Sequence, residues 1–444
     1  MSADISFKNI NRLAIPALIA GVAEPVLSLT DTAIIGNVDL NATESLAAVG
    51  IVGTFLSMLI WVFGQTRSAI SSLVSRYLGA NDLDSIKSLP AQAMFIMTVL
   101  SAVIIVLTYP FAEGIFKLYN AENLILDYSA TYYRIRVFGF PFTLLTIAVF
   151  GTFRGLQNTF YPMIIAIVGA ALNIILDVIL VYGIQGYVQP MYIEGAAYAS
   201  VIAQFVMAAL SIIYLLKKTD IPLRFTFPWN KEIKNFMLMI LNLFVRTLAL
   251  NVTLYFATRF ATGYGKSYIA AYTIAINLWF LGAFIIDGYA SAGNILSGKL
   301  LGSKSYAELI KLSNTLIKYG IFCGMILAAL GALFYRPIGR IFTQEPNVLD
   351  QFYNVFWIIL LMQPLCALAF IFDGMFKGMG KMKFLRNLLL MATGLVFIPI
   401  LFFLDQFNLK LYGIFIALTF WMMARGIPLI LKFRQLFLAK AEKE

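Results

Sequence analysis

An internal repeat constrains this chain more than any other feature of its sequence. The two copies align at a constant offset of 223 positions (301 − 78 = 223), without gaps over about a quarter of the chain. Matches of Leu or Ala arise by chance in an apolar chain, but matched Pro and Gly at one offset do not. We therefore predict two copies of one unit, an organisation typical of membrane transporters. The matched pairs include Leu78-Gly79 with Leu301-Gly302, Pro141 with Pro364, Gly151 with Gly374, and Gly155 with Gly378.

The composition indicates that this repeat folds in a membrane. Hydrophobic residues make up 61% of the chain and charged residues 12%, and the mean hydropathy is +0.84, far outside the range of soluble proteins. We predict an all-α polytopic membrane protein with twelve transmembrane helices, six in each copy. Because six is an even number, the two copies are predicted to be parallel repeats. The predicted helices start near Leu13, Leu46, Ala91, Thr131, Tyr161, Ile193, Ile233, Tyr268, Leu312, Phe352, Phe384 and Leu411.

The distribution of charge predicts the orientation. The chain has 33 Lys and Arg against 22 Asp and Glu, and most of the basic residues fall in loops that are cytoplasmic if both termini are inside. We therefore expect a multi-pass protein of the cell (inner) membrane with both termini in the cytoplasm. The positive charge is explained by this orientation and by contact with anionic lipids. Nucleic-acid binding is a poor explanation, since the basic residues are spread over many short loops.

A polar segment divides the chain into two lobes. Residues 217–234 begin with Lys217-Lys218 and contain Pro222, which is typical of a linker. We predict an N-terminal six-helix lobe at 1–216, a cytoplasmic linker at 217–234 and a C-terminal six-helix lobe at 235–444. Within the first lobe, Gly79 and Gly155 predict helix ends.

Two prolines fall in the first predicted helix. Pro16 and Pro25 each remove a backbone hydrogen bond and favour a kink. The sequence leaves open whether this kink is a static bend or a moving hinge.

The main candidate site is a set of polar residues inside predicted membrane helices. Asp31 lies in the first helix, and Asn173 and Asp177 share one face of the fifth because they are four residues apart. A charge at the centre of a membrane helix costs about 2.5–3.5 kcal/mol unless something offsets it. Such a cluster can carry a proton or hold a monovalent cation such as Na⁺. The alternative is that both aspartates are neutral packing residues.

This acidic cluster is not repeated in the second copy. At the offset of 223, Asp31, Asn173 and Asp177 correspond to apolar residues, namely Leu254, Val396 and Ile400. A duplicated scaffold with one asymmetric polar site suits a transporter in which only one lobe binds the coupling ion. The chain contains no histidine, so proton coupling near neutral pH has to use carboxylates.

Other charged residues in the predicted helices are less decisive. Arg246 and Asp287 are candidate polar residues of the second lobe, and we expect them to pair with each other rather than to bind substrate. Glu24 and Asp373 face a cavity or lie near an interface. Neither cysteine, Cys323 or Cys366, indicates a disulfide or a thiolate metal site.

Several motifs together resemble those of the multidrug and toxic compound extrusion (MATE) family, more closely its DinF-like branch. Each motif is weak alone, but their order on a six-plus-six repeat is specific, and the similarity covers essentially the whole chain. The motifs are Thr30-Asp31-Thr32, Leu78-Gly79, the segment from Arg154 to Thr159, the segment from Asn173 to Asp177, and the segment from Glu194 to Ser200.

The resemblance implies a twelve-helix antiporter whose two lobes surround a central cavity. It implies export of organic cations and other amphipathic compounds by alternating access, against an inward flow of protons or sodium. By motif position, Asp31, Asn173, Asp177 and Ser200 fall at the branch's cation and proton site, and Pro16 falls where its first helix bends. We expect proton coupling, no bound cofactor and a monomer.

Three other classes of protein remain as alternatives. A flippase for lipid-linked precursors has a related fold, but it is expected to carry a strongly cationic cavity, and Arg246 is the one clear central cation in the sequence. A membrane-embedded enzyme would need catalytic side chains, and the chain contains no histidine and no thiolate pair. A passive channel is the third alternative, but coupled carboxylates on a duplicated scaffold are more typical of an exchanger.

Overall fold

The helices of a computed structural model agree with the predicted spans. The structure describes residues 5–38 and 41–444, except that the side chains of residues 23–29 lie outside the description. Eleven helical segments within the described residues are long and apolar enough to cross a membrane. Together with the 29-residue helix α1 (Phe7–Ile35), they coincide with the twelve predicted helices. No β-sheet forms among the described residues, where one isolated bridge joins Ile184 and Val188.

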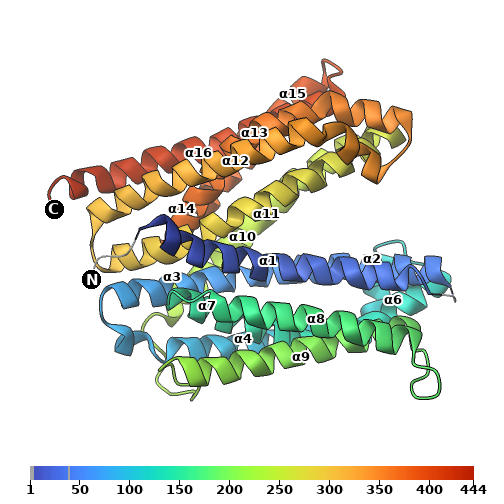
Figure 1. The fold of residues 1–444 in the computed structure, drawn as a ribbon, viewed down its shortest axis with the longest axis horizontal. Helices are drawn as coiled ribbons and strands as arrows, with labels where there is room; N and C mark the ends of the chain where they lie inside the picture. Colours follow the sequence, from blue (N-terminus) through green and yellow to red (C-terminus); the bar gives the residue numbers. More distant parts are fainter. Residues whose placement is uncertain (1–4, 39–40) are drawn as a thin grey trace. The chain divides into compact units, whose positions relative to one another are not determined.

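The first copy of the repeat is built from several helices, many of them short (Figure 1). Its third, sixth and ninth helices end in Gly79, Arg136 and Lys218, and the predicted helix ends at Gly79 and Gly155 are confirmed. After α1 come α2 (Ala42–Gly64), α3 (Thr66–Gly79), η1 (Leu83–Ile86), α4 (Leu89–Thr108), α5 (Ala112–Lys117), α6 (Asn123–Arg136), η2 (Val137–Gly139), α7 (Phe140–Gly155), α8 (Phe160–Tyr182) and α9 (Tyr192–Lys218).

The second copy is built mainly from long continuous helices. One of its spans contains a short π-helical segment, η3, between two shorter helices. The elements are α10 (Ile233–Gly263), α11 (Lys266–Gly302), α12 (Tyr306–Phe342), α13 (Pro346–Gly378), α14 (Met382–Met391), η3 (Ala392–Phe397), α15 (Ile398–Asp405) and α16 (Lys410–Ala441).

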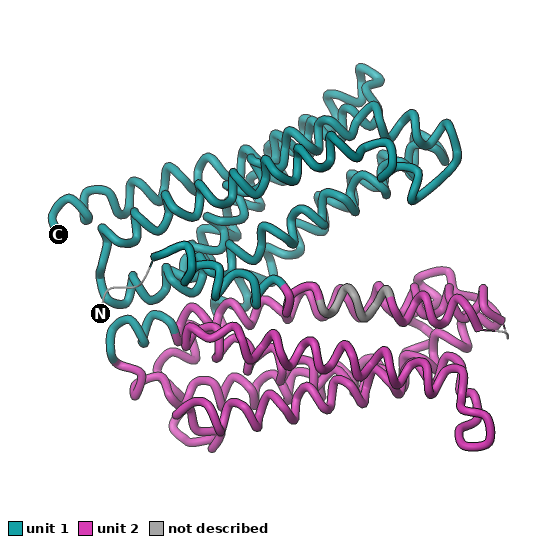
Figure 2. Tube along the Cα trace, viewed as in Figure 1, with its two compact units in different colours: residues 1–18, 75–81, 238–444 teal, residues 19–74, 82–237 magenta. Residues whose placement is uncertain are grey.

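Two compact units divide the chain, and one of them contains two short pieces that are remote in sequence from the rest of it (Figure 2). One unit comprises residues 19–74 and 82–237. The other comprises residues 1–18, 75–81 and 238–444, so it includes the start of α1 and the end of α3. The start of α1 belongs there because Ile10, Leu13 and Ala14 pack in one apolar cluster with side chains of α11 and α13 such as Leu296 and Phe372.

The repeat predicted from sequence is visible as repeated packing. A Cβ atom added at Gly151 would lie 2.8 Å from the carbonyl oxygen of Arg67, and one added at Gly374 would overlap the carbonyl oxygen of Ala290. Both the glycines and their partners are 223 positions apart. The same close helix contact therefore occurs once in each copy.

A second close approach joins the end of α3 to the end of α11. A Cβ atom on Gly79 would overlap the carbonyl oxygen of Lys299, and one on Gly302 would overlap that of Arg76. These contacts are reciprocal: each glycine approaches the backbone of the segment that is equivalent to its own in the other copy of the repeat.

We expect Gly79→Ala to lower the stability of the folded protein by about 1–3 kcal/mol, the usual range for overpacking. The backbone of Lys299 has to move to make room for the methyl group. Gly50→Ala is the matched control, because Gly50 also lies in a helix and no atom lies within 4 Å of its added Cβ. Thermal unfolding of both purified variants in detergent checks this, and equal midpoints would contradict the predicted crossing.

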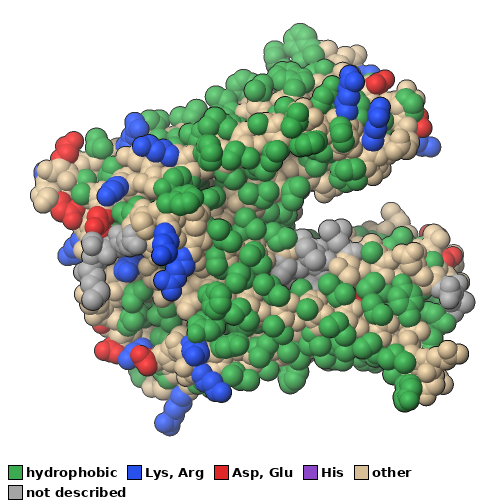
Figure 3. All heavy atoms as spheres, in the orientation of Figure 1, with side chains coloured by type: hydrophobic (Ala, Val, Ile, Leu, Met, Phe, Trp, Pro, Cys, Tyr) green, Lys and Arg blue, Asp and Glu red, His purple; other side chains and the backbone are tan. Residues whose placement is uncertain are grey.

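The surface of each unit suits a lipid environment. Large apolar side chains are exposed along the helices, including Val106, Leu107, Leu241, Leu333 and Leu361. Lys and Arg side chains gather near the helix ends, while the surface between the ends is largely hydrophobic (Figure 3). This arrangement is the one expected of a multi-pass membrane protein.

Candidate ion-coupling site

Four polar residues predicted from sequence meet inside the unit of residues 19–74 and 82–237. Asp31 comes from α1, Asn173 and Asp177 come from one face of α8, and Ser200 comes from α9. All four are at least 95% buried. The structure therefore brings together every residue of the predicted ion-coupling site.

The hydroxyl group of Ser200, on α9, forms hydrogen bonds with side chains of both α1 and α8. It donates a hydrogen bond to Oδ2 of Asp31 over 3.1 Å, and it accepts one from Nδ2 of Asn173 over 3.3 Å. The carboxyl group of Asp177 lies near that of Asp31. Two carboxylates, an amide and a hydroxyl thus share one buried space.

Several oxygen atoms in this cluster have no hydrogen-bond partner among the side chains and backbone that the structure describes. They are Oδ1 of Asp31, Oδ1 of Asn173 and both carboxylate oxygens of Asp177. A buried polar atom without a partner is unfavourable by about 1–3 kcal/mol. A proton or a bound cation would satisfy these oxygens, so the cluster is chemically suited to take up either one.

The sequence analysis missed the positive charge next to the cluster. A guanidinium nitrogen of Arg136, on α6, lies 4.0 Å from Oδ2 of Asp31, and Nε of Arg136 donates to the hydroxyl of Tyr132 over 3.4 Å. The available signal was a basic residue within the fourth predicted span, a span in which the sequence analysis considered no charged residue. With one guanidinium for two carboxylates, the cluster carries one negative charge in excess when both carboxylates are ionised.

The predicted hinge prolines both lie within α1. Pro16 falls in the piece of α1 that belongs to the unit of residues 238–444, and the next residues of the helix belong to the other unit from residue 19 onward. Pro25 and Glu24 fall among residues 23–29, whose side chains lie outside the described part of the structure. The roles of both prolines as hinges stay predictions.

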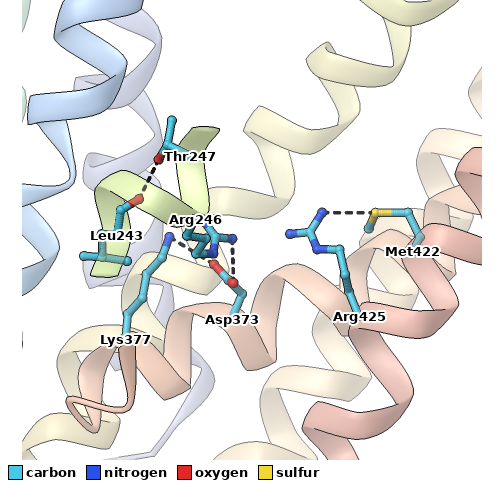
Figure 4. A network of polar contacts seen from close by, with 7 residues as sticks. All are labelled: Leu243, Arg246, Thr247, Asp373, Lys377, Met422 and Arg425. Atoms are coloured by element: carbon cyan, nitrogen blue, oxygen red, sulfur yellow. Dashed lines mark hydrogen bonds and ion pairs between the residues drawn. The ribbon is translucent and has the colours of Figure 1, made fainter. Parts of the chain in front are cut away.

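A second buried charged cluster lies in the unit that contains residues 238–444 (Figure 4). Arg246 of α10 donates to Oδ1 of Asp373 over 2.6 Å, and Nζ of Lys377 lies 3.0 Å from Oδ2 of the same carboxylate. The predicted pairing of Arg246 with Asp287 is wrong, because Asp287 is exposed on α11. Asp373 is its partner because α13 places that carboxylate, rather than one on α11, beside α10.

Arg425 of α16 completes this second cluster and was also missed. Its side chain is 3% exposed and lies with Arg246 and Asp373 around one small cavity. The expectation that Arg246 is the one central cation is therefore wrong. Lys377 was counted as a loop residue, although the last turn of α13 holds its side chain largely buried.

A comparison with protein families decides what kind of protein carries these clusters. The MatE family model matches residues 16–179 and again residues 239–403, which together cover most of the chain. The chain belongs to the MATE family. The two matches begin 223 positions apart (239 − 16 = 223), which is the offset of the internal repeat.

Relatives of this MATE chain come from bacteria and plants. It is 24% identical to DNA damage-inducible protein F of Escherichia coli (strain K12), with 96% of this chain and 91% of that protein covered. It is 25% identical to Protein DETOXIFICATION 42 of Arabidopsis thaliana, over 94% of this chain and 90% of that protein. It is 23% identical to Multidrug export protein MepA of Staphylococcus saprophyticus, over 98% of this chain and 96% of that protein.

Solved structures of MATE proteins share the fold. A crystal structure of a MATE protein in the bent conformation matches with a TM-score of 0.90 at 22% identity, over 98% of this chain and 96% of the other. An outward-facing MATE multidrug resistance transporter matches with a TM-score of 0.86, over the same shares of the two chains. The prediction of an all-α polytopic fold with a duplicated unit is confirmed.

The asymmetry of the acidic cluster also holds at the register that the bounds of the two MatE matches give. The family matches end 224 positions apart (403 − 179 = 224), so the second copy is one residue longer, and its π-helical segment η3 lies within the matched region. At offsets of 223 and 224, Asp177 corresponds to Ile400 and Leu401, both apolar. The carboxylate is therefore absent from the second copy with either register.

Proposed function

We propose that this MATE protein is a proton-coupled antiporter that exports amphipathic small molecules, including organic cations. The observation that carries the proposal is the buried cluster of Asp31 and Asp177. Among the described residues, three of their four carboxylate oxygens have no hydrogen-bond partner, and one guanidinium group lies nearby. One proton both cancels the excess charge and supplies a missing hydrogen-bond donor. Protonation therefore changes the bonding between α1 and α8.

The proposed cycle is alternating access. When the protein faces outward, Asp31 and Asp177 take up protons from outside, α1 bends near Pro16, and the bound substrate is expelled. When it faces the cytoplasm, the protons are released and the anionic cluster favours the binding of the next substrate. Coupling follows because protons and substrate stabilise different states of one lobe.

Sodium coupling is the second candidate and rests on the same residues. Na⁺ prefers oxygen ligands, and the cluster offers two carboxylates, the amide oxygen of Asn173 and the hydroxyl of Ser200. A single Na⁺ cancels the excess negative charge as one proton does. The hydroxyl of Ser200 would then turn its lone pair to the ion and give up its bond to Asp31.

Imposing the two gradients separately distinguishes these candidates. We expect proteoliposomes of defined orientation to move a fluorescent organic cation when a pH gradient is imposed in sodium-free buffer. A sodium gradient at equal pH on both sides should drive no transport. The opposite pattern would replace protons by sodium, and transport under neither gradient would overturn the proposal.

The distribution of charge supports a location and an orientation of the protein in the membrane. We propose that the chain acts as a monomer in the cell (inner) membrane with both termini in the cytoplasm, and that it is a transporter rather than an enzyme. The MATE membership and the transporters among its relatives support this proposal. Small amphipathic compounds and membrane lipids are its proposed partners, with no bound cofactor and no nucleic acid.

A further inference from the structure

The linker that joins α9 to α10 is bound to the start of α4. The buried side chain of Gln92 donates hydrogen bonds to the backbone carbonyl oxygens of Thr226 over 2.9 Å and Pro228 over 3.3 Å. Its Oε1 accepts a third from the backbone nitrogen of Asn230 over 2.9 Å. The side chain of Asn230 in turn donates to the carbonyl oxygen of Ser85 over 2.9 Å. These bonds set the backbone of the linker, and with it the side chains that the linker presents.

This backbone presents a cluster of aromatic rings on the outside of the protein. The ring centre of Phe225 lies 4.8 Å from that of Phe95, on α4. Phe227 and Trp229 pack against Phe225 with ring centres 4.9 and 5.5 Å away. Phe227 is nevertheless 72% exposed and Trp229 43% exposed. We call these four residues the linker aromatic cluster. An apolar patch on a well-defined loop marks a surface that is covered by something other than water.

The linker aromatic cluster continues the lipid-facing side of α4. Phe95, Val99, Val103 and Val106 are exposed, and steps of three or four residues place them on one helix face. Their helix is one of the segments long and apolar enough to cross a membrane, so this face contacts lipid tails. Phe95 begins the face near the start of α4 and touches Phe225. The cluster therefore lies where the lipid-facing surface ends, which is the depth at which tryptophan is enriched in membrane proteins.

The charge around the linker aromatic cluster is mainly positive. Residues 217–234 contain five basic and two acidic side chains. Anionic headgroups of the cytoplasmic leaflet attract basic segments that lie next to a membrane helix. The five basic residues, all of them exposed, are Lys217, Lys218, Arg224, Lys231 and Lys234.

We propose that the linker is a membrane-surface anchor that inserts Phe227 and Trp229 among the headgroups of anionic phospholipids. Aromatic rings beside Lys and Arg side chains are the combination that binds a segment to the surface of an anionic bilayer. The linker thus lies on the membrane and holds the first lobe at a fixed depth. The preference for anionic lipid rests on the proposed orientation, which puts the linker on the cytoplasmic side, but the contact with lipid does not.

Fluorine NMR of protein labelled with 5-fluorotryptophan tests the contact in nanodiscs of phosphatidylcholine and phosphatidylglycerol. The chain has five tryptophans, and the resonance of Trp229 is the one that disappears in Trp229→Phe. We expect a phospholipid with a nitroxide near its headgroup to broaden this resonance strongly, and a gadolinium chelate dissolved in the water to broaden it weakly. Trp421 is the internal control, because it is fully buried and should respond less to both reagents. If the chelate broadens Trp229 more than the nitroxide does, the linker stands in water and the proposal is wrong.

The choice of lipid is tested with the same nitroxide on two different headgroups. In the parent protein, a phosphatidylglycerol label should broaden Trp229 about twofold more than a phosphatidylcholine label at equal mole fraction, because the basic side chains concentrate it. This excess should vanish in the double variant Lys218→Gln with Arg224→Gln. It should persist in Lys311→Gln with Arg434→Gln, which removes two exposed basic residues from the other unit. Equal broadening by the two labels in the parent would overturn the preference for anionic lipid.

These measurements are independent of the proposed transport. Both faces of a nanodisc offer the same lipids and no gradient is present, so neither the orientation nor the coupling ion affects the result. A linker that stands in water, together with intact export, rejects only the anchor. Lipid contact at Trp229 without export rejects only the proposed function.

Discussion

Gradient-driven export should fall to the level of empty vesicles in Asp177→Asn and in Asp31→Asn. Asparagine keeps the shape of aspartate but cannot ionise, so each variant removes a proton site and the excess negative charge of the cluster. The cycle then lacks the change in charge that switches α1 and α8 between two arrangements. Efflux of a fluorescent organic cation from proteoliposomes under a pH gradient measures this effect.

A carboxylate elsewhere in the same lobe provides the control for these two variants. Asp84 lies in η1, is largely exposed and forms a surface ion pair with Lys87, so Asp84→Asn should export normally. Thermal unfolding separates lost coupling from lost folding. Removing a buried charge at Asp177 should leave the midpoint unchanged or raise it, and a folded Asp177→Asn variant that exports at the parent rate would contradict the account.

Loss of the carboxylate at Asp373 should destabilise the protein by about 3–5 kcal/mol, the usual effect of removing one partner of a buried ion pair. In Asp373→Asn, the buried cations Arg246 and Lys377 lose the carboxylate that pairs with both of them, and Arg425 stays buried beside them. Chemical or thermal unfolding of the purified protein in detergent measures the change. This is the largest stability effect that we expect from a single isosteric substitution in the chain.

Two further variants test whether charge balance is the cause. Asp287→Asn removes an exposed carboxylate from the neighbouring helix α11 and should change stability by less than about 1 kcal/mol. Adding Arg246→Met to Asp373→Asn removes one buried cation together with the carboxylate. The net charge of the cluster then equals that of the parent, and the double variant should recover part of the lost stability. Equal destabilisation by Asp373→Asn and Asp287→Asn would show that the buried pair has no special role.

The sequence was sufficient to predict the parts of the fold that depend on hydropathy and repetition. All twelve predicted starts fall within the observed spans, because a membrane helix requires a long apolar run that can be recognised without knowing its neighbours. The assignment of residues 1–18 and 75–81 to the unit of residues 238–444 was not predictable, since it depends on which helices pack together.

The two charged clusters differ in how far sequence could predict them. Asp31, Asn173 and Asp177 are acidic or amide residues in apolar helices, and the motifs shared with MATE proteins grouped them with Ser200. The partner of Arg246 depends on the rotation of α10, α11 and α13 about their axes, which hydropathy does not determine. Arg136 and Arg425 were missed for a simpler reason: both are basic residues inside predicted membrane helices, and among such residues only Arg246 was considered.

Proton release on substrate binding tests the central claim most directly. If protons expel substrate through Asp31 and Asp177, then by thermodynamic linkage substrate binding must displace protons from the same residues. Adding a fluorescent organic cation to the purified parent protein in weakly buffered, sodium-free solution should release protons, recorded with a pH indicator. The double variant Asp31→Asn with Asp177→Asn should release none, and release equal to that of the parent would contradict the account.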